Sequence, residues 1–319
     1  MQNELPESLR ARGFTVVEAR AQGVPPGTLR NGSLATPYRG IRTVERPKTL
    51  VERAAAFAPL LRPWQALGGI SALATLGLPV PWRMGSAKTV EVVSATGRGY
   101  PSRAGVRVRR ISVERFEAWE IDGLRAAAAP LAWALMAGRC TVHELVVIGD
   151  AIVSNADNYP DRRLPGPLAT LDELQEVTEQ RGGKLGAASL RAALPRIRER
   201  VESPRETDMR LFIVDAGLPE PEVQAAVHDP QSGRLLGRAD LMHREARVVE
   251  EYEGDGHRSK QQWDRDIEKY REFARIGLHV VRATNRDFVP SPERWLLDLE
   301  AVLDHRSLPP LRNDGSKQE

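Results

Sequence analysis

The stretch GRADLMHREARVVEEYEGDGH, residues 237–257, predicts most about the fold of this chain. Two segments of it, GRADLMH and RVVEEYE, each have the length of one β-strand, and side chains alternate between the two faces of a strand. Glu251 and Glu253 are therefore expected on one face, with Tyr252 on the other. Because the neighbouring strand would carry Asp240, the sequence predicts three carboxylates on one surface.

Carboxylates that converge at close range repel one another unless a hard divalent cation neutralises them. The pattern therefore predicts a metal-dependent phosphodiesterase site that takes Mg²⁺ or Mn²⁺. Asp240 and Glu251 are the expected side-chain ligands, and the backbone carbonyl of Tyr252 is a further one. Glu253 or His257 would orient or deprotonate the attacking water.

A simpler interpretation of the same stretch is a charged edge strand. In that case Glu250, Glu251 and Glu253 would be solvated or paired with arginines such as Arg238 and Arg258. The valines before the glutamates and the glycine turn after them favour a strand that delivers side chains to a cleft. The residue pattern alone leaves both interpretations open.

Other elements surround these strands in a regular order. A helix is expected from about Leu190 to Ala216, interrupted around VESPRE, where Ser203 can cap a new helical segment that begins with Pro204. PEVQAAVHD and GLHVVRAT are the expected outer strands. Further helices are predicted from about Lys260 to Arg275 and after Ser291 and Pro292. The predicted fold class is α/β.

The succession GRADL, EYEGDGH, WDRDIEKYREF and LHVVRAT resembles the PD-(D/E)XK nuclease superfamily. More narrowly, it is similar to bacterial proteins whose C-terminal domain looks like very-short-patch-repair (Vsr) endonucleases. Such proteins often carry an N-terminal winged helix similar to that of abortive-infection type IV antitoxins, and residues 14–44 look like this module. The resemblance implies a restriction-endonuclease-like mixed sheet, flanked by helices, at the C-terminal end.

The resemblance also implies roles for individual residues. Asp240 matches the strand aspartate and Glu251 the second acidic ligand of the superfamily. Glu253 occupies the position usually held by lysine, although the Vsr-like branch commonly has an acid or a histidine there. His257 falls where that branch keeps a histidine near the scissile phosphate.

Two further residues lie outside the central stretch. Glu206 matches an acidic residue on the helix before the first strand, which can bind a metal ion or water. Arg282, at the end of LHVVRAT, matches a polar residue beside the active site, and its guanidinium could bind phosphate with two hydrogen bonds. An ordinary surface arginine is the alternative for Arg282.

Expected DNA contacts come from both ends of the chain. Arg265 and Lys269 lie four residues apart on one helix face, where they could neutralise phosphates, and Lys260 begins the same helix. Arg30 and Arg39 are the expected contacts of the N-terminal module. A salt-bridged surface helix is the alternative for Arg265 and Lys269.

The chain divides into five expected parts. Residues 1–50 are expected to form a winged-helix-like module. FTVVEARAQGVPPGTLR predicts a helix, a turn and a second helix, and Thr15 is the expected N-cap with Glu18 as its capping-box partner. PYRGIRTV is the expected wing. A small helical hairpin without a nucleic-acid role is the alternative. Residues 51–155 are an α+β scaffold, residues 156–186 a linker with a short helix, residues 187–305 the nuclease-like domain, and residues 306–319 a polar tail.

The middle segment shows no chemistry of its own. WQALGGISALATLGL is expected to be a helix, KTVEVVSA and GVRVRRIS strands, and Thr141 and Glu144 the capping box of a helix that begins near residue 142. We expect residues 51–155 to be a scaffold and a possible contact surface for a protein partner.

Composition sets the broad limits. A chain of 319 residues with 41% hydrophobic residues can form two or three domains. Cys140 is the single cysteine, which excludes disulfide frameworks and cysteine-rich zinc sites. The apolar stretch Ala126 to Ala137 is too short to span a bilayer, and the polar N-terminal residues lack an apolar signal segment, so a cytoplasmic protein is expected.

The function predicted from the sequence is divalent-metal-dependent hydrolysis of DNA by an endonuclease. The alternative is a DNA-binding transcriptional regulator or antitoxin whose nuclease-like domain has lost activity, for which Glu253 in place of lysine is the main support. A nuclease that cleaves RNA would use the same site. The net charge of +3 is only weak evidence for a polyanionic partner.

Overall fold

The computed structural model describes residues 5–10, 12–30, 32–95, 103–254 and 260–307, and the side chains of 260–263 and 307 are not among the described features. The chain divides into two compact units, Met1–Glu199 (unit 1) and Arg200–Glu319 (unit 2). Both combine helices with a mixed sheet, which confirms the α/β class.

Unit 2 contains a four-stranded sheet with the order β11-β10-β9-β8. Its strands are β8 (Glu222–His228), β9 (Leu235–His243), β10 (Val248–Glu253) and β11 (His279–Thr284). β8, β9 and β10 are antiparallel neighbours, whereas β10 and β11 are parallel. A parallel pair needs a crossover connection, which α11 (Lys260–Arg275) provides.

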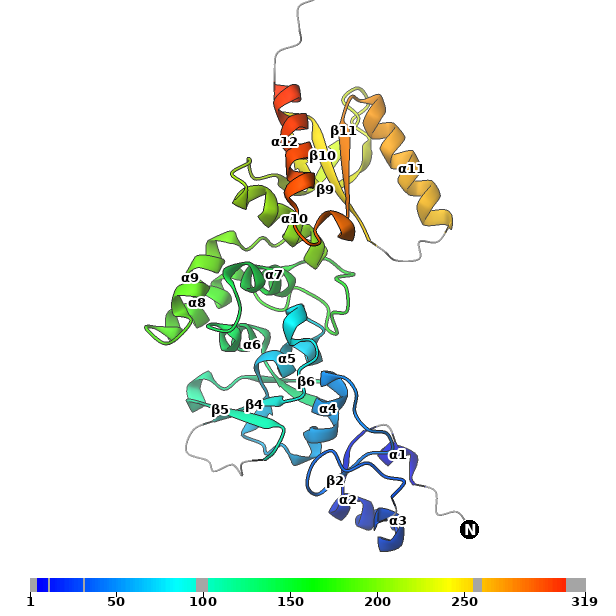
Figure 1. Cartoon of the computed structure of the whole chain (residues 1–319), viewed down its shortest axis with the longest axis vertical. Helices are drawn as coiled ribbons and strands as arrows, with labels where there is room; N and C mark the ends of the chain where they lie inside the picture. Colours follow the sequence, from blue (N-terminus) through cyan, green and yellow to red (C-terminus); the bar gives the residue numbers. More distant parts are fainter. Residues whose placement is uncertain (1–4, 11, 31, 96–102, 255–259, 308–319) are drawn as a thin grey trace, which may run out of the picture. The chain divides into compact units, whose positions relative to one another are not determined.

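Helices cover both faces of this sheet (Figure 1). On one face, α10 (Pro204–Asp215) and α12 (Glu293–Ser307) bury Met209 and Trp295 in a cluster that includes Val248. On the other face, Phe273 of α11 packs in a cluster that includes Val249. Val248 and Val249 are consecutive, so strand alternation sends their side chains to opposite cores.

The predicted elements of unit 2 are confirmed closely. All four strands are present, and α11 has the predicted bounds. The interrupted helix is two separate helices, because α9 (Ala187–Ala193) ends before the break and belongs to unit 1. α10 then begins after Ser203, whose Oγ accepts a hydrogen bond from the Glu206 backbone N–H at 3.3 Å.

Replacing Ser203 by alanine should lower the free energy of unfolding by about 1 kcal/mol, because the first turn of α10 loses its side-chain cap. Urea denaturation of the full chain measures this loss. Threonine at the same position keeps the hydroxyl and should restore most of the stability. Equal stability of the alanine and wild-type proteins would contradict this role of Ser203.

Unit 1 contains a five-stranded sheet with the order β5-β4-β3-β7-β6. The strands are β3 (Gln65–Leu67), β4 (Val90–Ala95), β5 (Val106–Ile111), β6 (Ala118–Ile121) and β7 (Leu124–Ala127). Helices of this unit lie before, between and after these strands: α4 (Leu50–Phe57), α5 (Gly69–Leu76), α6 (Ala129–Met136), α7 (Val142–Val153), α8 (Leu171–Arg181) and α9. Trp133 of α6 and Cys140 are buried in this unit.

Two predictions for unit 1 are wrong. The expected helix at residues 64–78 is a strand, β3, followed by α5, because the chain turns at Gly68 and at Gly69, which has a φ of +47°. The short helix expected within residues 156–186 is present as α8, but these residues are not a linker, because Leu174 and Thr178 of α8 are buried against the rest of unit 1. A helix that buries side chains is part of the domain, so unit 2 begins at Arg200 rather than at residue 187.

The N-terminal residues contain α1 (Glu7–Arg10), β1 (Phe14–Thr15), α2 (Val16–Ala21), α3 (Pro26–Arg30) and β2 (Ile41–Arg42). Thr15 caps α2 through the Glu18 N–H, as predicted, and Gly23 forms the turn between α2 and α3. β1 and β2 pair antiparallel. These elements belong to unit 1 and do not form a separate compact unit of their own.

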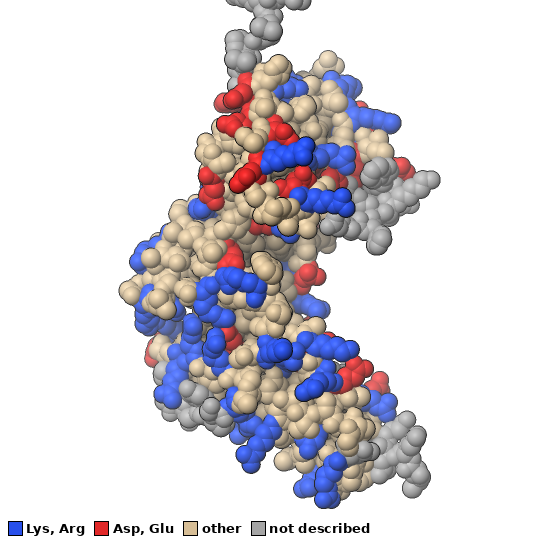
Figure 2. Space-filling model, viewed as in Figure 1, with Lys and Arg blue, Asp and Glu red and all other residues tan. Residues whose placement is uncertain are grey.

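Charge differs strongly between the two units. Unit 1 contains 27 Lys and Arg against 19 Asp and Glu, a net charge of +8, and unit 2 contains 19 against 24, a net charge of −5. Figure 2 shows basic side chains over much of the visible face of unit 1 and a concentration of acidic ones on unit 2. Within the described ranges, the structure contains no helix with the length and apolar character needed to span a bilayer.

Candidate active site

The predicted acidic site lies where β9 and β10 run side by side. The register pairs Glu250 with Leu241, so Asp240 and Glu251 are the next residues along the two strands. There the backbone N–H of Tyr252 donates to Asp240 Oδ2 at 2.8 Å. Asp240 and Glu251 are therefore close neighbours, as the sequence predicts.

Strand alternation on β10 is also as predicted. Glu251 and Glu253 both reach Tyr270 of α11, since its hydroxyl lies 3.4 Å from Glu251 Oε2 and 3.0 Å from Glu253 Oε1. Tyr252 points to the opposite face, where its ring stacks on Phe288 with 6.0 Å between centroids. Both glutamates thus face α11.

A lysine from α11 lies against Glu251. Lys269 Nζ is 2.8 Å from the Glu251 carboxylate, whose side chain is only 6% exposed. Sequence analysis places Lys269 among DNA contacts; in the structure its nearest charged group is this carboxylate. In this chain the ammonium group beside Glu251 comes from Lys269 on α11, whereas position 253 holds an acid.

Glu253 has partners of its own. Arg282 Nε donates to Glu253 Oε1 at 2.8 Å, and the Tyr270 hydroxyl donates to the same oxygen. In the described part of the chain, no three His, Cys, Asp or Glu side chains are close enough together to hold one metal ion. The expected meeting of Asp240, Glu251 and Glu253 around a single cation is therefore wrong in its third member, because Arg282 and Tyr270 hold Glu253.

Glu206 approaches the site from α10. It is 6% exposed, and its Oε2 accepts hydrogen bonds from the Glu202 N–H and from Gln224 Nε2, each at 3.0 Å. Gln224 has a φ of +48°, a conformation that costs a residue with a side chain about 1 kcal/mol or more. β8 pairs its flanking residues with Leu241 and Ala239, so Gln224 lies beside Asp240. The strained backbone aims its amide at Glu206.

The acidic groups hold their protons more strongly than isolated carboxyls. Burial, and then the charge of Asp240, raise the pKa of Glu206 to about 8 and the pKa of Glu251 to about 7. Burial also raises the pKa of Asp240, although the Tyr252 N–H opposes this shift. Burial is the first cause in all three carboxyls, and raised pKa values in neighbouring buried acids are typical of functional sites.

Without added metal, the free energy of unfolding should fall as the pH is raised from 5 to 8. Folded Glu206 keeps its proton over this range, whereas in the unfolded chain Glu206 releases it above the ordinary pKa of 4.5. Glu206→Gln removes this titration. Between pH 5 and pH 8, the free energy of unfolding of the variant should fall by roughly 3 kcal/mol less than that of the wild type. Urea denaturation in EDTA at several pH values measures both slopes. Glu245→Gln, on an exposed turn, is the control; equal slopes in all three proteins would contradict the shifted pKa.

The alternative of an edge strand is wrong for the place of β10 in the sheet, although Glu253 does pair with an arginine, Arg282; Arg258 lies outside the described residues. β10 lies between β9 and β11, and Glu250 and Glu251 are 0% and 5% exposed. Glu250 Oε1 is 2.7 Å from His243 Nδ1, and His243 Nε2 is 2.8 Å from the Pro219 carbonyl. This buried pair belongs to the core on the other face of β10. Arg238 pairs with Glu202 at 3.6 Å and does not neutralise the β10 glutamates.

The remaining predicted residues are placed as follows. His257 lies outside the described residues, and the side chain of Lys260 is not described. Arg265, Arg30 and Arg39 are exposed on α11, on α3 and in the turn before β2. None of these three is part of the acidic site.

Three features of the site were not predicted from the sequence: Tyr270, Gln224 and the pairing of Lys269 with Glu251. Gln224 had a usable signal, since it is the single polar residue within the apolar run VQAAV of β8. Tyr270 and Lys269 had none beyond their helix face, because the distance from α11 to β10 depends on tertiary packing.

No protein-family model matches this chain. Two curated proteins from Mycobacterium tuberculosis, of strains CDC 1551 / Oshkosh and H37Rv, are similar to it, each with 29% identity over 154 residues. Both are described as uncharacterized proteins. The similarity covers 44% of this chain and 56% of each relative, so the chain spans about half the length of the curated relatives it matches.

Proposed function

We propose that unit 2 is a divalent-metal-dependent endonuclease domain with a restriction-endonuclease-like fold, and that it hydrolyses phosphodiester bonds of DNA. The observation that carries this proposal is the pair Asp240 and Glu251, adjacent on β9 and β10, with raised pKa values and with Lys269 beside them. Buried carboxyls with shifted pKa values and a neighbouring ammonium group are typical of catalytic sites.

The residues fit a hard cation. Asp240, Glu251 and the backbone carbonyl of Tyr252 would hold Mg²⁺ or Mn²⁺, and an octahedral ion of this kind usually keeps several waters as its other ligands. When bound, the ion would supply charge stabilisation for the phosphate and acidify a water molecule. Its positive charge would also offset the burial and the neighbouring negative charge that raise the pKa of both carboxyls.

The chain's own side chains would orient the substrate. Lys269 places a positive charge next to Glu251, where it can neutralise a phosphate oxygen or hold a proton. Arg282 is tied to Glu253 through Nε, which leaves its terminal nitrogens available for hydrogen bonds with phosphate. Glu206, kept protonated near neutral pH, can hold or release a proton at the edge of the site.

Incubation of the full-length protein with supercoiled plasmid in Mg²⁺ or Mn²⁺ tests this function. We expect open-circular and linear DNA, no cleavage in EDTA, and no cleavage by Asp240→Asn, which keeps the shape of the side chain. Glu245→Asn, on the exposed turn, should cleave like the wild type. Plasmid that stays supercoiled under all these conditions would contradict the proposal. The same assay with RNA identifies the substrate.

The competing candidate is a DNA-binding regulator or antitoxin without hydrolytic activity. The observation that favours it is the engagement of Glu253 by Arg282 and Tyr270, since a carboxylate held in this way is not free to act as a base. It would bind DNA through Arg30 and Arg39 in unit 1. A gel-shift assay separates the two candidates: retarded but uncut DNA in Mg²⁺ supports the regulator. Either function places the protein with DNA in the cytoplasm.

A further inference from the structure

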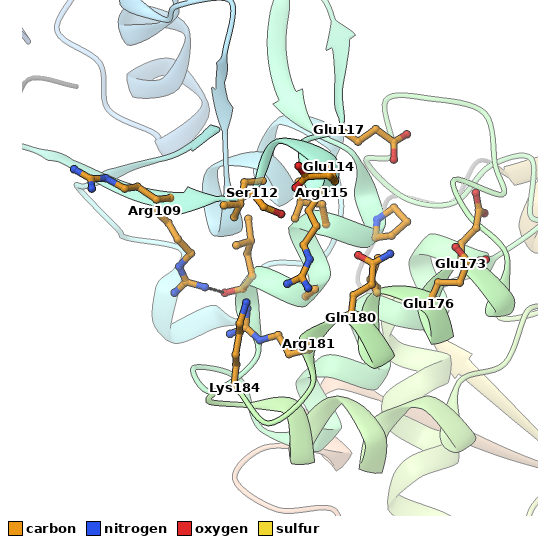
Figure 3. Close-up of a pocket in the computed structure, with 17 residues that line it drawn as sticks. Arg109, Ser112, Glu114, Arg115, Glu117, Glu173, Glu176, Gln180, Arg181 and Lys184 are labelled. Atoms are coloured by element: carbon orange, nitrogen blue, oxygen red, sulfur yellow. Dashed lines mark hydrogen bonds between the residues drawn. The ribbon is translucent and has the colours of Figure 1, made fainter. Parts of the chain in front are cut away.

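A cleft in unit 1 lies far along the chain from the acidic site and has a different chemistry. It has a volume of about 670 Å³ and is formed by the end of β5, the β5–β6 connection, α6 and α8. Ligand pockets for small molecules commonly have volumes of 300–1,000 Å³. Figure 3 shows its polar side chains gathered along one face of α8 and on the connection opposite.

One end of this cleft is basic. Arg109, Arg115, Arg181 and Lys184 line it, and Arg115 extends from the β5–β6 connection toward the last turn of α8 (Figure 3). Arg109 donates to the Leu135 carbonyl at 2.9 Å, and Arg181 donates to the Leu185 carbonyl at 2.8 Å. Considering described residues only, none of the four forms an ion pair with a carboxylate. Glu114, beside Arg115, also lines the cleft, but no described ion pair ties it to these four cations, so an anion can bind them.

Arg181 has a hydrogen-bond donor in the cleft that no protein group satisfies among the described residues. Its Nε is buried and has no hydrogen-bond partner among the described atoms. Burial, followed by the charges of Arg109 and Arg115, lowers the pKa of Arg181. A buried donor without an acceptor is unfavourable, and so is a guanidinium group close to two others. A bound anion would relieve both.

The rest of the cleft has the features needed for the uncharged part of a ligand. Leu131, Leu135 and Val177 supply apolar surface. Glu176 and Gln180 are exposed one turn apart on the α8 face that carries Arg181, and a carboxylate can accept hydrogen bonds from sugar hydroxyls. Glu176 precedes Arg181 by five residues, a rise of about 7 Å along the helix. That separation suits the two ends of one sugar phosphate unit.

We propose that this cleft binds a nucleoside phosphate, with its phosphate between Arg115, Arg181 and Lys184, its sugar hydroxyls at Glu176 and Gln180, and its base on the apolar surface of α6. The site is independent of the acidic site in unit 2 and of any activity there. Bidentate hydrogen bonds from arginine are well suited to a phosphate group.

Calorimetric titration of the full-length protein with AMP and ADP tests the proposal. We expect one saturable site per chain, and affinity at least about tenfold weaker in the double variant Arg115→Glu and Lys184→Glu, since each loses a charge-assisted contact. Both residues are exposed and outside the core, so the fold should persist. Lys88→Glu, an exposed substitution elsewhere in unit 1, should bind like the wild type.

Parallel titrations identify the chemistry that is recognised. Adenosine should bind much more weakly than AMP because it has no phosphate, and ribose 5-phosphate and inorganic phosphate should bind more weakly because they have no base. Several results would overturn the proposal: no saturable AMP or ADP binding, equal weakening by Lys88→Glu, equal affinity for ribose 5-phosphate, or binding of a single-stranded oligonucleotide without binding of a mononucleotide.

Discussion

Replacing Glu251 by glutamine should reduce metal-dependent plasmid cleavage by about three powers of ten. The substitution keeps the shape of the side chain and removes one of two expected carboxylate ligands, and the charge stabilisation that such a ligand set supports amounts to several kcal/mol of the barrier. The rate of supercoiled plasmid loss under excess protein measures the effect. Glu251 is buried beside Lys269, and the amide oxygen of the glutamine can still accept a hydrogen bond from that ammonium group.

A loss of folding must be separated from a loss of chemistry in this experiment. Circular dichroism and the urea midpoint of Glu251→Gln should stay close to wild type, and Glu245→Gln should cleave normally. Mg²⁺ should raise the melting temperature of the wild type but not of Glu251→Gln, because a ligand stabilises only the state that binds it. Wild-type cleavage by Glu251→Gln would show that the hydrolytic site lies elsewhere.

Replacing Lys269 by methionine should lower the cleavage rate by about 10²-fold, the lower range for loss of a group that assists proton transfer or stabilises charge. The ammonium also lowers the pKa of Glu251, so without it that carboxyl should hold its proton to higher pH. The rate of the variant should therefore recover partly as the pH is raised above about 7. Single-turnover cleavage between pH 6 and pH 9 measures both effects.

Two companion variants make this result specific. Lys269→Arg keeps the positive charge and should retain more activity than Lys269→Met. Arg265 lies on an exposed part of the same helix, and Arg265→Met should change cleavage little. If Lys269→Met and Arg265→Met behave alike, Lys269 is an ordinary phosphate contact and not part of the site.

The fold of unit 2 could be predicted well from sequence because its signals are local. Alternating apolar residues mark β8 to β11, and Ser203 with Pro204 marks the start of α10. Unit 1 was harder. Residues 64–78 are mostly apolar and small, so periodicity could not separate the short β3 from α5. α8 looked like part of a linker because 3 of its neighbouring residues, 182, 183 and 186, are glycines.

The site was predictable only where neighbours on adjacent strands follow from register. Asp240 beside Glu251, and Glu251 on the face of Glu253, follow from strand alternation. The side chains that contact these carboxylates do not follow from strand alternation. Lys269, Tyr270 and Arg282 come from α11 and β11, and their contacts depend on how closely the helix packs on the sheet through Phe273. The strained backbone of Gln224 likewise depends on the β8–β9 pairing, although its position as the single polar residue of VQAAV was a local signal.

A crystal structure with bound Mn²⁺ tests the central claim most directly, because the anomalous scattering of manganese locates the ion without reference to the protein. We predict one strong peak about 2.1 Å from a carboxylate oxygen of Asp240 and one of Glu251, with the Tyr252 carbonyl as a further ligand. A well-ordered site without manganese there, or manganese bound only by residues elsewhere, would contradict the account.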